Sequence, residues 1–75
     1  MYHTIAFTVE RVVDVEVSRN RPLERVLVEA DTRLRVQIKP YVVETDSGPV
    51  EVADLFFEDG TATRTVPFAS FCFVD

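Results

Sequence analysis

The sequence contains few of the residues that cross-link small domains or hold metal ions. Its 75 residues include one cysteine, one histidine, two glycines and no tryptophan. One cysteine cannot form a disulfide within the chain, and no zinc spacing, glycine-rich phosphate loop or paired catalytic carboxylate motif is present. We therefore expect no metal, no cofactor and no enzymatic activity. His3 is expected at the surface, and Cys72 as a small buried hydrophobe.

Long apolar runs are also missing, which excludes a membrane-spanning helix. The first residues lack the basic and apolar segments of a secretory leader, so we expect a cytoplasmic protein. A chain of 75 residues forms at most one domain, and we assign residues 1–75 to a single small domain. Because a domain of this size buries only about 60% of its unfolded surface, we expect a homo-oligomer or docking onto a larger protein.

Acidic residues outnumber basic ones, and the excess lies in the second half of the chain. The net charge is −5. Residues 1–40 contain seven basic and six acidic side chains (net +1), whereas residues 41–75 contain one basic and seven acidic (net −6). Nucleic-acid binders usually have a basic domain, so any basic surface in this acidic protein must be local.

Alternating apolar and polar residues predict β-strands along most of the chain. Residues 4–18 alternate with one fault at 11–12, where a long strand is expected to bend or bulge and serve two sheets. Residues 33–39 form the cleanest strand, which Pro40 is expected to interrupt. A strand at 41–45 and a turn at 46–49 follow.

Residues 22–30 allow two interpretations. Their apolar residues Leu23, Val26, Leu27 and Ala30 have the spacing of a helix face, and Pro22 precedes them. The alternation of Val26 and Val28 with polar or outward residues also suits a strand, and we favour the strand. In that interpretation it pairs with 33–39, with Val28 opposite Leu34.

The stretch 50–74 predicts a hairpin and a short last strand. Gly60 ends a three-residue loop at 58–60, which suits a type I turn with a G1 bulge. That loop sets Phe56 opposite Ala62, Asp54 opposite Arg64 and Val52 opposite Val66. One face then carries Val50, Val52, Phe56, Ala62, Val66 and Phe68, and the other carries Ala53, Leu55 and Phe57 against Thr61, Thr63 and Thr65. A turn at 67–69 precedes the last strand.

Five or six short strands at turn spacings of about ten residues predict an all-β fold. We expect a small antiparallel barrel or roll of SH3-like or OB-like type, with one short helix at 22–30 as the alternative local structure.

Aromatic residues gather in the acidic half and suggest a protein-binding patch. Six of them cannot all enter a core this small, so at least one of Phe57, Phe71 and Phe73 is expected at the surface beside Glu58 and Asp59. An exposed aromatic ringed by acids, together with an edge strand, suits a non-enzymatic interaction module: an accessory subunit, adaptor or inhibitor. The alternative is a sheet that wraps and buries both faces.

Basic residues on one strand face suggest a second function. Arg33, Arg35 and Lys39 alternate on the strand at 33–39, and Arg19 and Arg21 precede it. Such a stripe could bind phosphates of nucleic acid or another polyanion. The simpler interpretation is a solvated face paired with carboxylates.

Overall fold

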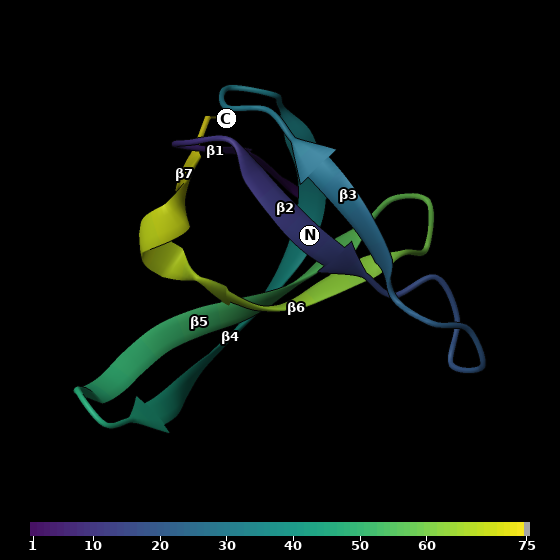
Figure 1. Cartoon of the computed structure of the whole chain (residues 1–75). Coiled ribbons are helices and arrows are strands. Elements are labelled where there is room, and N and C mark those ends of the chain that lie inside the picture. Colours follow the sequence, from purple (N-terminus) through teal and green to yellow (C-terminus); the bar gives the residue numbers. More distant parts are fainter. Residues whose placement is uncertain (75) are drawn as a thin grey trace.

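The computed structural model describes residues 1–74 and is all-β apart from one 3₁₀ turn (Figure 1). The elements are β1 (His3–Phe7), β2 (Arg11–Val15), β3 (Glu24–Val28), β4 (Leu34–Thr45), β5 (Gly48–Phe57), β6 (Ala62–Pro67), η1 (Phe68–Ser70) and β7 (Phe71–Phe73). Five strands form one antiparallel sheet in the order β6-β5-β4-β1-β7, and β2 and β3 form a separate two-stranded sheet. The all-β prediction is confirmed, but residues 1–74 form seven strands rather than the predicted five or six, and the two sheets do not close into a barrel.

The predicted long strand at 4–18 is divided between the two sheets. It breaks at residues 8–10, just before the expected fault, so that β1 joins the large sheet and β2 the small one. Inward-facing side chains of the small sheet, Val13, Val15 and Val28, belong to the same buried cluster as residues of the large sheet. The break therefore lets one stretch of chain contribute to both sides of the core.

Residues 22–30 contain a strand and no helix, but its predicted partner was wrong. β3 pairs with β2, with Val13 opposite Val26, and does not pair with β4. At Val36, β4 already has β1 on one side and β5 on the other. No edge of β4 is free there, so β3 folds back on the strand before it.

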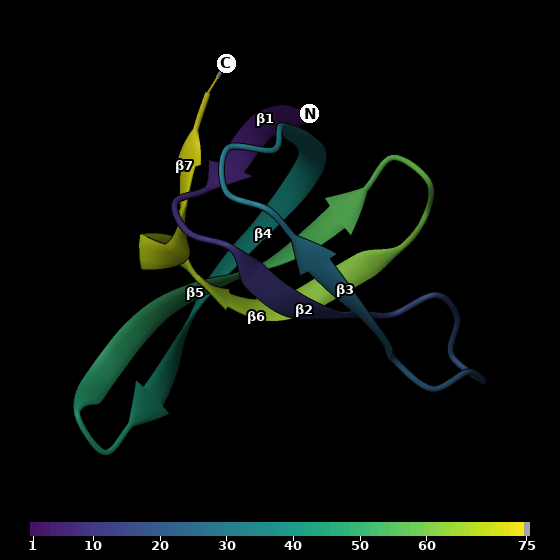
Figure 2. The same ribbon diagram turned by 45° about the horizontal axis from the view of Figure 1, so that its top comes forward.

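The predicted interruption at Pro40 does not occur, because β4 continues through it to Thr45. β1 pairs only with residues 34–36 of β4, so one edge of β4 is unpaired beyond that point and tolerates a residue without an N–H. β4 and β5 extend together as an arm away from the rest of the molecule (Figures 1 and 2). The predicted turn closes the arm at residues 46–47, with Gly48 at φ +106°.

The β5–β6 hairpin follows the predicted register only near its turn. Phe56 lies opposite Ala62, and Gly60 has the positive φ (+89°) that the G1 bulge requires. Farther along, an extra residue on β6 shifts the register by one, so that Val66 faces Ala53 where the sequence predicted Val52. The bulge falls near Thr65, whose φ is +57°.

This one-residue shift decides which side chains form the core. Side chains alternate between faces, so the bulge moves Val66 to the face of Ala53 and Leu55, both of which are fully buried. That face packs against the β2–β3 hairpin, together with Ile5 and Phe7 of β1. The last strand occurs as predicted, after a 3₁₀ turn at 68–70.

Candidate binding cleft

An apolar cleft of about 260 Å³ lies between the β2–β3 hairpin and the large sheet. Its walls are built largely by Val13, Val15, Val26, Val28, Leu34 and Phe57. The hairpin's inward side chains come from opposite pairs such as Val13 and Val26, so both strands contribute to one wall. Val13 is buried, whereas Val26 is 40% exposed. The cleft is therefore closed along β2 and open along β3.

Two carboxylates stand where the cleft meets solvent. Glu24 at the start of β3 and Asp59 in the β5–β6 loop both line the cleft and are exposed. Neither forms an ion pair with any of residues 1–74. The Thr61 hydroxyl (2.6 Å) and backbone N–H (2.9 Å) donate hydrogen bonds to Asp59 Oδ1, and these bonds lower the pKa of Asp59. The mouth of the cleft is thus negatively charged at neutral pH.

The size of the cleft favours side chains over a cofactor as its occupant. Pockets that enclose drug-sized ligands and cofactors usually measure about 300–1,000 Å³. The cleft is smaller than that range and is lined mainly by valine and leucine side chains, together with Phe57, Thr61 and the two carboxylates. One or two inserted apolar side chains suit such a space.

The outer edge of β3 is open beside this cleft. β3 pairs with β2 on one side, and its other edge pairs with no strand in the described part of the chain. The free edges of β4, β5 and β6 are interrupted by proline or covered by other residues. The free parts of β4 and β5 contain Pro40 and Pro49, and β6 is covered at Ala62 by backbone hydrogen bonds with Glu16 (2.6 and 3.1 Å). Proline and covering contacts are common ways to block strand addition at an edge.

A second polar cluster, around Asp54 on the outer face of the large sheet, braces the bulge. Asp54 accepts hydrogen bonds from Tyr41 Oη (2.8 Å), Thr65 N (3.0 Å) and Arg64 Nη1 (3.1 Å). Arg64 Nε also donates to Glu16 Oε2 (2.9 Å). Burial alone would raise the pKa of Asp54, but these hydrogen bonds and the Arg64 charge together lower it. The predicted Asp54–Arg64 ion pair is confirmed, and both side chains have further hydrogen-bond partners in this cluster.

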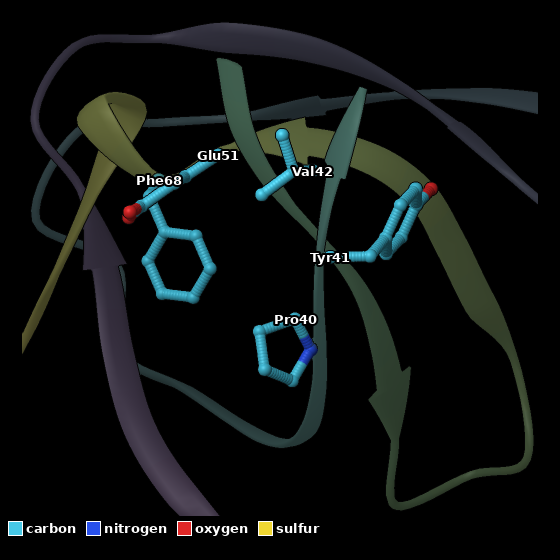
Figure 3. A pocket seen from close by; sticks show the side chains of 5 residues that line it. All are labelled: Pro40, Tyr41, Val42, Glu51 and Phe68. Atoms are coloured by element: carbon cyan, nitrogen blue, oxygen red, sulfur yellow. The ribbon is translucent and has the colours of Figure 1, made fainter. Parts of the chain in front are cut away.

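A shallower hollow of about 280 Å³ lies at the base of the β4–β5 arm. Figure 3 shows Phe68, Pro40 and Val42 around a common space, with the ring of Tyr41 on the other side of β4. Tyr41 is engaged with Asp54 on that other face. The hollow therefore has fewer converging groups than the cleft between the sheets.

The predicted partner-binding residues are not gathered in one patch. Phe57 and Asp59 line the cleft, and Glu58 lies beside them with its carboxylate 3.7 Å from Arg35 Nε. Phe71 is only 6% exposed and packs edge-on against Phe7, whereas Phe73 is 52% exposed on β7. The wall formed by β2 and β3 was not predicted, because the alternation in 11–17 and 24–28 does not reveal that these strands pair.

The predicted basic stripe is also divided. Arg33, Arg35 and Lys39 are exposed, with Arg35 beside Glu58 and Lys39 directly opposite Asp54 across the β4–β5 ladder. Arg19 and Arg21 belong to the β2–β3 loop, which projects away from β4 in both views (Figures 1 and 2). Part of the stripe is thus balanced by carboxylates.

The two chemically reactive side chains lie near the β1–β7 edge. Cys72 is exposed, which corrects the expectation of a buried hydrophobe, because it alternates with the buried Phe71 and so points away from the core. His3 packs edge-on against Phe73 with ring centroids 5.4 Å apart. Within residues 1–74, no three histidine, cysteine or acidic side chains are placed to hold a metal ion. Helices long and apolar enough to cross a membrane are likewise absent from this part of the chain.

Comparison with protein-family models gives no match, and neither curated proteins nor solved structures match the chain. The function is therefore argued from the cleft and the strand edge themselves.

Proposed function

We propose that the chain is a non-enzymatic protein-interaction module, which serves as an accessory subunit, adaptor or inhibitor. Its contact surface is the apolar cleft between the sheets together with the adjoining edge of β3. The observation that carries this proposal is the open wall: Val26 is 40% exposed, and Leu34 and Phe57 are only partly buried, although all three line one apolar space. Covering these groups would remove apolar surface from water, which is the main favourable term in protein association.

The position of the cleft supports binding by a protein. A partner that inserts side chains from the β3 side would contact both sheets at once and supply the packing that an unclosed barrel lacks. Small domains of this length often gain stability from a partner subunit. Self-association is the main alternative, because a second copy of the chain could also cover the open wall.

We also propose that the fold is a roll of SH3-like rather than OB-like type. The order β6-β5-β4-β1-β7, with a 3₁₀ turn before the strand that returns to β1, supports this assignment. A fold of this kind hosts many functions, so the proposed function depends on the cleft and not on the fold.

Two adjacent residues of β3 provide a matched test. Val26 faces the cleft, whereas Leu27 faces outward and is 56% exposed. Tagged wild-type chain, Val26→Glu, Val26→Thr and Leu27→Glu would be purified gently from the native host and passed over a sizing column with light scattering. We expect a stoichiometric protein to co-elute with the wild type and with Leu27→Glu. Retention should be reduced by Val26→Thr and abolished by Val26→Glu, because buried polar groups without partners are costly.

Three outcomes would contradict the proposal. They are the absence of any stoichiometric protein with the wild type, equal retention by all variants, and equal loss in the Val26 and Leu27 variants. Thermal unfolding of each variant serves as the folding control. The milder Val26→Thr variant keeps the test informative if Val26→Glu does not fold.

A further inference from the structure

We propose that the partner contributes an extended segment that adds to the outer edge of β3 as a third strand of the small sheet. The segment has aliphatic side chains at alternate positions, which enter the cleft, and lysine or arginine residues flanking them, which meet Glu24 or Asp59. This inference rests on the proposed function and specifies the chemistry of the partner. Addition of a strand to an exposed sheet edge is a general mode of peptide recognition.

The edges of the two sheets single out β3. Pro40 and Pro49 lie on the free parts of β4 and β5, and β6 carries a bulge and the Glu16 contact. β7 has an open edge without proline, but it is only three residues long. β3 offers a five-residue edge without proline that directly borders a cavity. The outer edge of β2 also borders the cleft, but it faces β6, with Thr63 bonded to the Asp14 carbonyl and Glu16 paired with Ala62. Among the described strands, β3 therefore best combines a free edge with access to the cleft.

The pleat of β3 determines where the side chains of an added strand would point. Neighbouring strands lie about 4.7–4.9 Å apart, and side chains of paired residues project to the same face. The inward residues of β3, Val26 and Val28, line the cleft. Alternate residues of an added strand would therefore also project inward, toward Leu34 and Phe57 on the opposite wall.

The carboxylates of the cleft indicate that the partner's segment carries positive charge. Glu24 and Asp59 both line the cleft and form no ion pair among the described residues, and the hydrogen bonds from Thr61 lower the pKa of Asp59. A cation beside either carboxylate would complement its charge. The net charge of −5 would also steer a basic segment toward the chain.

A second copy of the chain fits this edge less well. Antiparallel pairing of two β3 strands about Val26 would place Glu24 opposite Val28 of the second copy. It would supply no cation to Glu24 or Asp59 from β3's inward face, and it would bring together two chains that each carry a net charge of −5. Complementary charge therefore favours a basic partner.

Synthetic peptides test the strand and its charge separately. The probe is a seven-residue peptide of alternating valine and threonine flanked by lysines, titrated into the ¹⁵N-labelled full chain. We expect amide shifts at residues 24–28 and at Leu34 and Phe57. A version flanked by glutamates should bind at least about tenfold more weakly, because like charges at an interface are costly. A version N-methylated on alternate backbone nitrogens should lose binding, since it cannot pair along the edge.

Several results would overturn this inference. They include shifts centred on β7, equal binding of the lysine and glutamate peptides, full binding of the N-methylated peptide, and no shift of β3 at millimolar peptide. Concentration-dependent dimerisation that Val26→Glu abolishes would assign the edge to a second copy instead. If a host protein still depends on Val26 while these peptide tests fail, strand addition is wrong and the interaction module stands.

Discussion

Asp54 shows how the outer face of the large sheet maintains the bulge. Its carboxylate is 6% exposed and accepts three hydrogen bonds, one of them from the backbone N–H of Thr65. Thr65 has a φ of +57°, which is costly for a β-branched residue and persists only when its surroundings impose it. Asp54 supplies that constraint by binding the Thr65 N–H directly.

Replacing Asp54 by asparagine should destabilise the protein by about 1–3 kcal/mol, because hydrogen bonds to a charged acceptor are lost in a buried place. The folded-state pKa of Asp54 is lowered, so its contribution is present above the unfolded pKa and is lost as pH falls through the folded one. We expect urea unfolding to show a difference between wild type and Asp54→Asn at pH 7 that shrinks below about pH 4. A difference that is constant from pH 7 to pH 3 would contradict this role.

The β4–β5 arm shows how proline shapes an exposed hairpin. Beyond residue 36 one edge of β4 has no neighbouring strand within residues 1–74, and Val42 on the arm is exposed. A long unpaired edge with apolar side chains is a template for association with other chains. Pro40 removes one N–H from this edge, and Lys39 beside it adds charge.

Pro40→Val should therefore promote association of the arm without unfolding the protein. The substitution restores a backbone donor and adds a strand-forming side chain on the free edge. We expect light scattering to show a mass that rises with concentration for Pro40→Val and stays constant for a matched Pro22→Val variant in the β2–β3 loop. Equal behaviour of the two variants would show that Pro40 does not protect this edge.

The charge of the whole molecule disfavours the polyanion hypothesis. The net charge is −5, Arg35 lies 3.7 Å from Glu58, and Lys39 faces Asp54. Three phosphate contacts by Arg33, Arg35 and Lys39 would give a log–log salt slope of about −2 for single-stranded nucleic acid. That signature separates such binding from the proposed protein contact, which depends on apolar burial.

We expect oligonucleotide binding to be weak, with little change on Arg35→Glu. Fluorescence anisotropy with a labelled single-stranded oligonucleotide at several salt concentrations measures the affinity. Arg19→Glu in the projecting loop is the control. Tight binding with a slope near −2, weakened by Arg35→Glu, would favour polyanion binding over protein binding through the cleft.

Local sequence predicted most of the strand positions and turns, although it joined β1 to β2 and interrupted β4 at Pro40. Period-2 alternation predicted β3 and β4, and glycine placed the turns at Gly48 and Gly60, because these signals depend on neighbouring residues alone. Local sequence did not predict which strands pair with one another. β3 pairs with β2 because β1 and β5 already flank β4 at Val36, and that competition exists only in three dimensions.

The candidate site was likewise predicted in part from the sequence and decided in part by the tertiary structure. The sequence placed Phe57 beside Glu58 and Asp59 and led us to expect exposed apolar surface, because composition limits what a short chain can bury. Tertiary structure decided that the bulge near Thr65 turns Val66 inward, that Phe71 is buried, and that the β2–β3 hairpin leaves an open apolar wall over Leu34. A one-residue shift reverses the face of the side chains that follow it in a strand, which explains Val66. Phe71 and the open wall depend on the separate β1–β7 and β2–β3 pairings.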